Sequence, residues 1–273
     1  MINDARPIGI FDSGIGGLTV LREIEKLLPV ENLIYLGDTA RVPYGTKSSE
    51  TVIRYSLENG RFLLSMDVKA IVVACNSASA VSIPELRSSF NIPILGVIEA
   101  GVEEAMHITN GAGIGVIGTH ATIESGRYDK LLKQKGAKNV ISKACPLFVP
   151  LAEEGWTDNP VAEQVARIYL EPFKGNGVDT LILGCTHYPL LQGVIGKVCG
   201  PGVALVNSAR AAALKLKQTL EENGLLNEDG GGNQKFYVTD SEKRAQVVGS
   251  RFLGRDLSNQ LEKADLTEFS HHG

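Results

Sequence analysis

Residues 67–77 read DVKAIVVACNS, and residues 177–187 read GVDTLILGCTH. Each stretch is an apolar run followed by a small residue, a cysteine and two polar residues. Uninterrupted apolar runs that alternate with amphipathic helical patterns are typical of the buried strands of a parallel sheet. Ligands bind at the carboxyl ends of such strands. The two stretches therefore predict two strands that present Cys75 and Cys185 at ligand-binding edges.

The two stretches belong to a longer repeat within the chain. Residues 8–14 read IGIFDSG, and residues 114–120 read IGVIGTH. The first of these strands ends at Asp12, 63 residues before Cys75. The second ends at Gly118, 67 residues before Cys185. The repeat predicts an α/β fold of two similar domains, each a mainly parallel sheet flanked by helices. We expect the domains to be related by a pseudo-twofold duplication, with the active site in the cleft between them.

The strand and helix patterns also set the expected domain boundaries. We expect the first domain to comprise residues 1–98 and 208–262, the second to comprise residues 99–207, and a tail to follow at 263–273. Strands are predicted at residues 8–12, 33–37, 70–75, 114–118, 180–184 and 235–239. Helices are predicted at residues 18–28, 49–65, 78–89 and 244–257.

Composition excludes several classes of function. The chain has 273 residues, of which 43% are hydrophobic, so it can form sizeable cores. Its net charge of -4 at pH 7 lacks the basic excess that suits a nucleic-acid partner, so none is expected. No apolar run approaches the roughly 20 residues of a membrane span, and the first residues lack the apolar core of a signal peptide. We therefore expect a cytoplasmic protein without membrane association, whose four cysteines are free thiols.

Cys75 has the predicted setting of a reactive thiol. It stands between a strand and a helix, and Asn76 and Ser77 follow it. A helix dipole and free N–H groups at this position favour the thiolate and lower the pKa of a thiol from about 8.5. Asn76 and Ser77 can hold a substrate carboxylate. Because free cysteine is also a common small core residue, Cys75 alone leaves both interpretations open.

Cys185 favours the catalytic interpretation because groups with acid–base chemistry follow it. Thr186 can donate a hydrogen bond to a carboxylate, and His187 is close enough in sequence to reach the thiol. A thiol–imidazole pair supports thiolate formation and general base chemistry. The remaining cysteines, Cys145 and Cys199, lack such neighbours, and we interpret them as packing or surface residues.

Two loops complete the predicted site. Residues 12–17, DSGIGG, join the first strand to the first helix, but they fit neither the GxGxxG nor the GK[ST] pattern of a phosphate loop. We interpret them as a tight turn that presents the carboxylate of Asp12 and the hydroxyl of Ser13 to the cleft. Tyr44 and Gly45 are expected to supply backbone donors from a second loop.

Taken together, these segments resemble the aspartate/glutamate racemase family. The matching stretches follow one another along almost the whole chain: GIFDSGIGG at 9–17, GDTARVPYG at 37–45, ACNSA at 74–78, CPLFVPL at 145–151, GCTHYPL at 184–190 and FYVTDS at 236–241. The two cysteine motifs with their polar followers are specific, whereas no single loop is.

The resemblance implies an enzyme that interconverts L- and D-glutamate and supplies D-glutamate for bacterial peptidoglycan. The reaction would use no pyridoxal phosphate, no metal and no other cofactor. Cys75 would take the α-proton from the D-isomer, with Asp12 as its helper. Cys185 would take it from the L-isomer, with His187 and an acidic residue as helpers.

The resemblance implies further residue roles. Alignment on the preceding Pro-Leu favours Glu153 as the acidic helper over the adjacent Glu154. Substrate binding is expected from Asp12, Ser13, Tyr44, Gly45, Asn76, Ser77, Thr119, Thr122, Thr186 and His187. Most family members carry threonine where this chain has Ser77, and we expect the hydroxyl to preserve carboxylate binding. The partners expected are glutamate as a small-molecule substrate and a second copy of the chain in a homodimer.

Two alternatives stay open at the level of sequence. The first is a racemase of the same family that acts on aspartate or a related amino acid. His187 favours glutamate, because aspartate-type members tend to carry an acidic residue there. The second is a nucleotide- or metal-binding α/β module in which the cysteines are structural.

Overall fold

Two separate parallel sheets frame the molecule, which is described by a computed structural model for residues 4–229 and 231–270. The first sheet has the strand order β10-β9-β2-β1-β3-β4, and all neighbouring strands are parallel. Its strands are β1 (Ile8–Asp12), β2 (Leu33–Gly37), β3 (Ala70–Val73), β4 (Ile94–Gly96), β9 (Gln234–Val238) and β10 (Leu261–Lys263). Strands β1 to β4 are buried along their whole length, which explains their uninterrupted apolar sequence.

The second sheet repeats the arrangement of the first. Its strands, β5 (Ile114–Gly118), β6 (Val140–Ala144), β7 (Thr180–Gly184) and β8 (Ala204–Asn207), are also all parallel. The order is β6-β5-β7-β8, so the strand that comes first in the chain lies between the second and the third, as in β2-β1-β3-β4. This shared order is the arrangement that the predicted duplication would leave.

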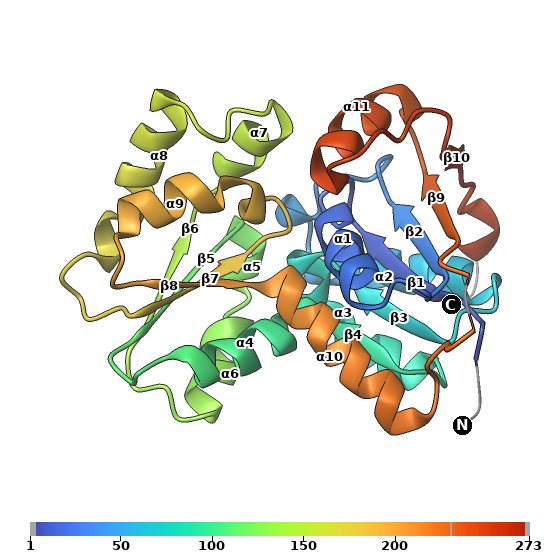
Figure 1. The fold of residues 1–273 in the computed structure, drawn as a ribbon, viewed down its shortest axis with the longest axis horizontal. Helices are drawn as coiled ribbons and strands as arrows, with labels where there is room; N and C mark the ends of the chain where they lie inside the picture. The colour runs from blue at the N-terminus through green and yellow to red at the C-terminus, as the bar shows by residue number, and fades with distance from the viewer. Residues whose placement is uncertain (1–3, 230, 271–273) are drawn as a thin grey trace.

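Helices cover both sheets (Figure 1). Around the first sheet lie α1 (Leu18–Leu27), α2 (Ser49–Leu64), α3 (Asn76–Ser89) and α11 (Glu242–Leu253). Around the second lie α4 (Val97–Ile108), α5 (His120–Glu124), α6 (Arg127–Gln134), α7 (Phe148–Glu153), α8 (Pro160–Leu170) and α9 (Gln192–Cys199). The 3-10 turns are η1 (Tyr44–Thr46), η2 (Glu171–Phe173), η3 (Tyr188–Leu191) and η4 (Thr267–Phe269). Within the described ranges, no helix is both long enough and apolar enough to span a membrane.

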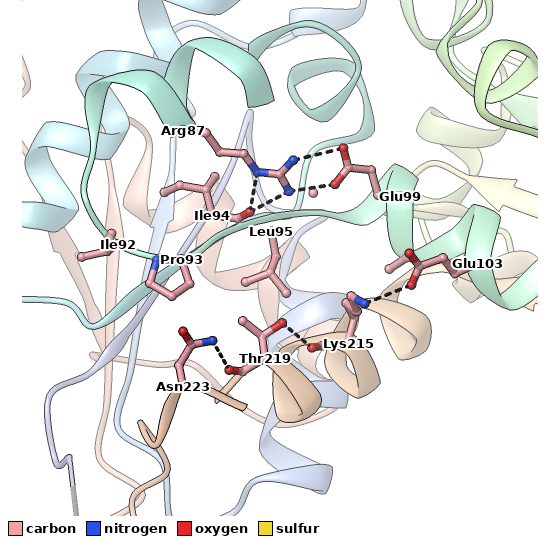
Figure 2. Close-up of a pocket in the computed structure, with 12 residues that line it drawn as sticks. Arg87, Ile92, Pro93, Ile94, Leu95, Glu99, Glu103, Lys215, Thr219 and Asn223 are labelled. Carbon is pink, nitrogen blue, oxygen red and sulfur yellow. Dashed lines mark hydrogen bonds and ion pairs between the residues drawn. The ribbon is translucent and has the colours of Figure 1, made fainter. Parts of the chain in front are cut away.

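The chain crosses between the two sheets twice, and the crossings lie side by side. The first crossing enters α4 directly after β4, and the second leaves β8 through α10 (Ser208–Asn223), which packs against both α4 and α1. Figure 2 shows the charged pairs at this junction: Lys215 on α10 pairs with Glu103 on α4 at 3.3 Å, and Arg87 pairs with Glu99 at 2.8 Å. A surface cavity of about 410 Å³ opens between these elements. The junction is therefore held by ion pairs as well as by apolar packing.

The predicted fold class is confirmed, with differences at the ends of elements. The strand expected at 70–75 ends at Val73, and the helix that follows begins at Asn76 rather than at residue 78. The helix expected to run to residue 257 ends at Leu253, because Gly254 takes the left-handed backbone conformation that terminates helices (φ +81°). The first sheet takes its strands from residues 8–96 and 234–263, and the second from 114–207. The division into domains at residues 98 and 207 stays a prediction.

The predicted tail needs a correction. Residue 263 is the end of β10, and the side chains of Ala264 and Leu266 are buried. Phe269 packs its ring against Phe62 at a centroid distance of 5.8 Å. These residues are apolar and meet the first sheet's own core, so they belong to the folded unit. Residues 271–273 of the expected tail lie outside the described residues.

Candidate active site

The carboxyl ends of β1, β3, β5 and β7 meet around one cavity of about 300 Å³. Every residue that the sequence predicts for the site lines it: Asp12, Ser13, Tyr44, Gly45, Cys75, Asn76, Ser77, Thr119, Thr122, Glu153, Cys185, Thr186 and His187. Both sheets contribute, because Cys75 follows β3 of the first and Cys185 follows β7 of the second. The two thiols that the repeat predicted thus face one common space.

The Cys75 side is built on the start of α3. Cys75 is the N-cap of this helix, and its Sγ lies 3.5 Å from the backbone N of Ala78 and 3.5 Å from Oγ of Ser13. Burial, together with the nearby charge of Asp12, raises the pKa of the Cys75 thiol to about 12. The prediction of a lowered pKa is therefore wrong, since desolvation outweighs the hydrogen bonds from the helix start. Cys75 rests as a thiol, which suits a proton donor.

Asp12 stands beside this thiol with an unsatisfied oxygen. Its Oδ2 accepts a hydrogen bond from the backbone N of Gly14 at 3.1 Å, whereas its buried Oδ1 has no partner among the described residues. Burial raises the pKa of Asp12, although the charge of His187 opposes the rise. Asp12 and Cys75 line the same cavity, and the charge of Asp12 acts on the Cys75 thiol.

The Cys185 side uses an imidazole instead of a helix start. Sγ of Cys185 lies 3.8 Å from Nδ1 of His187, and Nε2 of the same ring lies 3.2 Å from Oε1 of Glu153 on α7. Burial alone would lower the pKa of His187, but its contacts with Cys185 and Glu153 raise the pKa to about 10. The hydrogen bond from His187 in turn lowers the pKa of Glu153. The adjacent Glu154 is exposed and outside the cavity, so the geometry favours Glu153 as the partner.

The segment after Cys185 does not begin with an α-helix. Cys185 and Thr186 lead into the 3-10 turn η3, and the α-helix α9 begins only at Gln192. Cys185 therefore lacks the regular helix start that supports Cys75. The two sides of the cavity carry different helpers for their thiols.

Neutral donors line the rest of the cavity. Asn76 accepts a hydrogen bond from the hydroxyl of Tyr128 at 2.8 Å, and its buried Nδ2 has no partner in the described part of the chain. The hydroxyls of Ser77, Thr119 and Thr122 form a triangle with sides of 3.1 to 3.3 Å. No lysine or arginine is among the described residues that line the cavity. A bound carboxylate would therefore be held by amide and hydroxyl groups and by His187.

The loop that carries Tyr44 and Gly45 is anchored away from the cavity. The hydroxyl of Tyr44 donates to Oδ2 of Asp38, and Arg41 binds the same carboxylate. A Cβ atom on Gly45 would lie 3.3 Å from Oγ1 of Thr119, so the loop approaches the hydroxyl triangle closely. Tyr44 thus lines the cavity, while its hydroxyl binds Asp38 and anchors the loop.

The glycines of the first loop let the two halves meet. A Cβ atom on Gly16 would lie 2.2 Å from Oγ1 of Thr186 and 2.6 Å from the ring of His187, which leaves no room for a side chain. Thr19, one turn further on, donates its hydroxyl to the backbone oxygen of Thr186 at 2.9 Å. The loop from the first half therefore packs directly on the segment that carries Cys185.

Three lining residues were not predicted from the sequence: Val42, Pro43 and Val149. They are apolar, so they carry no chemical signal of their own. They fall inside the stretches at 37–45 and 145–151, which is the one sequence signal that could have found them.

Residues 4–229 and 231–270 contain no group of three His, Cys, Asp or Glu side chains arranged to hold a metal ion.

Comparison with known proteins shows the family of the chain. Residues 8–216 match the Asp/Glu/Hydantoin racemase family, and the chain belongs to that family. Its fold is thus that of a racemase, which is an isomerase.

Proteins described as glutamate racemases match nearly the whole chain. The one from Geobacter metallireducens is 53% identical over 93% of this chain and 95% of its own length, and the one from Persephonella marina is 49% identical over 96% and 98%. The solved structure of the Francisella tularensis glutamate racemase, in complex with D-glutamate, matches with a TM-score of 0.90 and 40% identity over 97% of this chain and 99% of that one. An aspartate racemase from Picrophilus torridus shares the fold alone, at a TM-score of 0.58 and 19% identity over 81% of this chain and 99% of its own.

Proposed function

We propose that this chain racemises glutamate, with Cys75 and Cys185 as opposing acid and base. The observation that carries the proposal is that the two thiols end matching strands of two similar sheets and line one cavity. Inversion at Cα needs one proton acceptor on one face and one donor on the other. Two half-sites that face each other supply both.

The surroundings of the two thiols suit conversion of the L-isomer. The raised pKa of His187 keeps the imidazole charged, and its Nδ1 lies 3.8 Å from Sγ of Cys185. Cys185, acting as the base in its thiolate form, takes the α-proton of L-glutamate and becomes a thiol, and the electron pair stays on Cα. The Cys75 thiol then gives its proton to the opposite face, which yields D-glutamate and leaves Cys75 as the thiolate. The D-isomer reacts by the same steps in reverse.

The carbanion must be stabilised, because the α-hydrogen of an amino acid is a very weak acid. Hydrogen-bond donors that are fixed in a cavity stabilise a developing negative charge more strongly than the same donors do in water. Asn76 Nδ2 and the backbone N–H groups at the start of α3 are such donors, and they are ordered before substrate arrives. We propose that they hold the α-carboxylate while charge develops on it.

Glutamate is favoured over aspartate by the site and by the relatives. The proteins that match over nearly the whole chain are described as glutamate racemases, whereas the aspartate racemase match is limited to the fold. The family resemblance also favours glutamate, because it implies an acidic residue at the position of His187 in aspartate-type members. The hydroxyls of Ser77, Thr119 and Thr122, together with Gly45, line the same cavity, and we propose that they bind the second carboxylate.

The proposal is tested by measuring racemisation of L-glutamate and L-aspartate by chiral chromatography. The protein is dialysed against a chelator, and no cofactor is added. We expect kcat/KM for glutamate to exceed that for aspartate by at least about 100-fold. The side chain of aspartate is shorter, so the polar groups that bind the second carboxylate of glutamate would be left without a partner. Equal activity on both substrates, or dependence on an added cofactor, would contradict the proposal.

We infer further that the D-glutamate serves peptidoglycan synthesis in the cytoplasm and that the enzyme is a homodimer. The family resemblance supports these points. Growth of a D-glutamate auxotroph carrying this chain, and sedimentation of the purified protein, would test them. Failure to restore growth would contradict the first inference, and a monomer at micromolar concentration would contradict the second.

A further inference from the structure

Helix α11 reaches across the boundary between the two halves of the molecule. It packs on α1 and β10 of the first sheet, yet three of its side chains contact the pair formed by His187 and Glu153 in the second half. Figure 1 shows α11 opposite α7, the helix that carries Glu153. We propose that Arg251, supported by Phe252 and Arg244, is a positioning residue that aligns Glu153 with His187 for the Cys185 half-reaction.

Arg251 binds the end of the short helix that carries Glu153. Its Nη1 donates a hydrogen bond to the backbone oxygen of Glu153, the last residue of α7. Carbonyls at a helix C-terminus have no partner within the helix, so an external donor fixes them and a cation is favoured there. The guanidinium lies over Gly155, where a Cβ atom would be 3.2 Å from Cζ of Arg251. Arg251 therefore sets the position of the turn from which the Glu153 side chain extends.

Phe252 and Arg244 act on the two side chains of the pair. The ring of Phe252 is fully buried and packs against the ring of His187, at a centroid distance of 4.9 Å and an interplanar angle of 79°. Such an arrangement holds an imidazole in one orientation. Nη2 of Arg244 lies 3.6 Å from Oε2 of Glu153, the oxygen that does not face His187. Because the Arg244 side chain is 73% exposed, this ion pair is the weaker contribution.

The arrangement couples one thiol to the other half of the molecule. Cys185, His187 and Glu153 all belong to the second half, but their alignment depends on a helix of the first. Cys75 has its own helper, Asp12, within the first half. A fault in α11 should therefore slow proton transfer at Cys185 and leave proton transfer at Cys75 intact. This inference rests on the proposed glutamate racemisation and on the assignment of the L-isomer to Cys185.

An isotope experiment separates the two thiols. For L-glutamate deuterated at Cα, Cys185 breaks the carbon–deuterium bond. For D-glutamate deuterated at Cα, Cys75 breaks it, and Cys185 only completes the reaction. In Arg251→Met the Cys185 step becomes more rate-limiting, so the primary isotope effect on kcat/KM rises for the L-isomer and falls toward unity for the D-isomer. Because the enantiomers have equal free energies in water, kcat/KM itself falls equally for both, by roughly tenfold.

Further variants make the result specific. Arg244→Gln should also raise the isotope effect for the L-isomer and lower it for the D-isomer, by smaller amounts than Arg251→Met. Arg251→Lys keeps a hydrogen-bond donor, so its isotope effects should be close to those of the wild type. Arg255→Met is the matched control, because Arg255 follows the same helix but binds Glu25, at 2.6 Å, and Gln234 within the first half. It should leave both isotope effects unchanged. Thermal melting checks that each variant is folded.

The outcomes distinguish this inference from the function on which it rests. Opposite shifts in Arg251→Met, absent from Arg255→Met, support the inference. Isotope effects that stay the same, or that shift in one direction for both isomers, overturn it while leaving the wild-type activity established. If the wild-type protein does not racemise glutamate, the proposed function fails first.

Discussion

Nε2 of His187 lies 3.2 Å from Oε1 of Glu153, although the two residues are 34 positions apart in the chain. The other nitrogen of the same ring faces Cys185. His187 is the only histidine among the described residues that line the cavity, and the charge that acts on Cys75 is that of Asp12. Two halves with the same strand order thus support their thiols by different chemistry. The difference between the helpers is why we propose opposite roles for the two thiols, with Cys75 as the proton donor and Cys185 as the base for the L-isomer.

Replacing either facing cysteine should remove racemisation. We expect Cys75→Ser and Cys185→Ser to lower kcat/KM by about 10³-fold, because a hydroxyl is a far weaker acid than a thiol and a far poorer base at neutral pH. Cys199→Ser is the matched control, since Cys199 ends α9 outside the cavity, and it should keep wild-type activity. A racemisation assay that finds near-wild-type activity in either cavity variant would contradict the two-thiol account.

The first loop tolerates no side chain at Gly16. In Gly16→Ala the new Cβ would meet Thr186 and the His187 ring at 2.2 and 2.6 Å, so the two halves cannot keep their present contact. We expect activity to fall by about 100-fold, since small misplacements of reacting groups have large effects. Gly14→Ala is the control, because its Cβ would meet Val42 at an ordinary 3.4 Å. Comparable kinetics for the two variants would show that the close approach at Gly16 is unimportant.

The hydroxyl of Ser77 should matter more than its size. Ser77→Ala breaks the triangle with Thr119 and Thr122 and removes a donor to bound carboxylate, so kcat/KM should fall by about tenfold. Ser77→Thr keeps the hydroxyl and should stay within about threefold of wild type. Steady-state kinetics on both variants decide the point. Equal losses would mean that packing at residue 77, and not hydrogen bonding, limits the reaction.

His187 should make stability depend on pH. Its pKa is raised to about 10 in the folded protein, above the ordinary value of 6.5, so folding favours the charged ring. The resulting stabilisation is fully present below about pH 6.5 and is lost as pH rises through about 10. The Tm difference between wild type and His187→Asn should therefore be largest near pH 6 and should shrink toward pH 10.

An exposed histidine provides the control for this pH dependence. His120 has a side chain that is 60% exposed, so His120→Asn should change Tm little at any pH. A Tm difference for His187→Asn that stays constant from pH 6 to pH 10 would mean that the ring is not held in its charged form.

Local sequence was sufficient for the framework of the site. The apolar runs before Cys75 and Cys185, in alternation with helical patterns, predict buried strands, and parallel strands place their carboxyl ends on one edge. The internal repeat then implied that two such edges face each other. The polar residues that follow each cysteine were found on the same grounds, and all of them line the cavity.

Properties that depend on tertiary packing were not accessible from local sequence. The pKa of Cys75 is raised because its surroundings are buried, which the helix start alone does not reveal. Arg251 and Phe252 reach His187 and Glu153 from more than 60 residues away in the chain, as a property of packing between the halves. Val149 is apolar, and nothing in its type distinguishes a cavity wall from a core.

The most direct test of the two-thiol account follows deuterium from D2O into glutamate. L-glutamate is incubated with the protein alone, and both enantiomers are recovered early in the reaction for mass and NMR analysis at Cα. We predict that newly formed D-glutamate carries deuterium at Cα, while the remaining L-glutamate still carries protium, because different thiols remove and deliver the proton. Early deuterium in the recovered L-glutamate, or protium retained in the D-glutamate, would contradict the account.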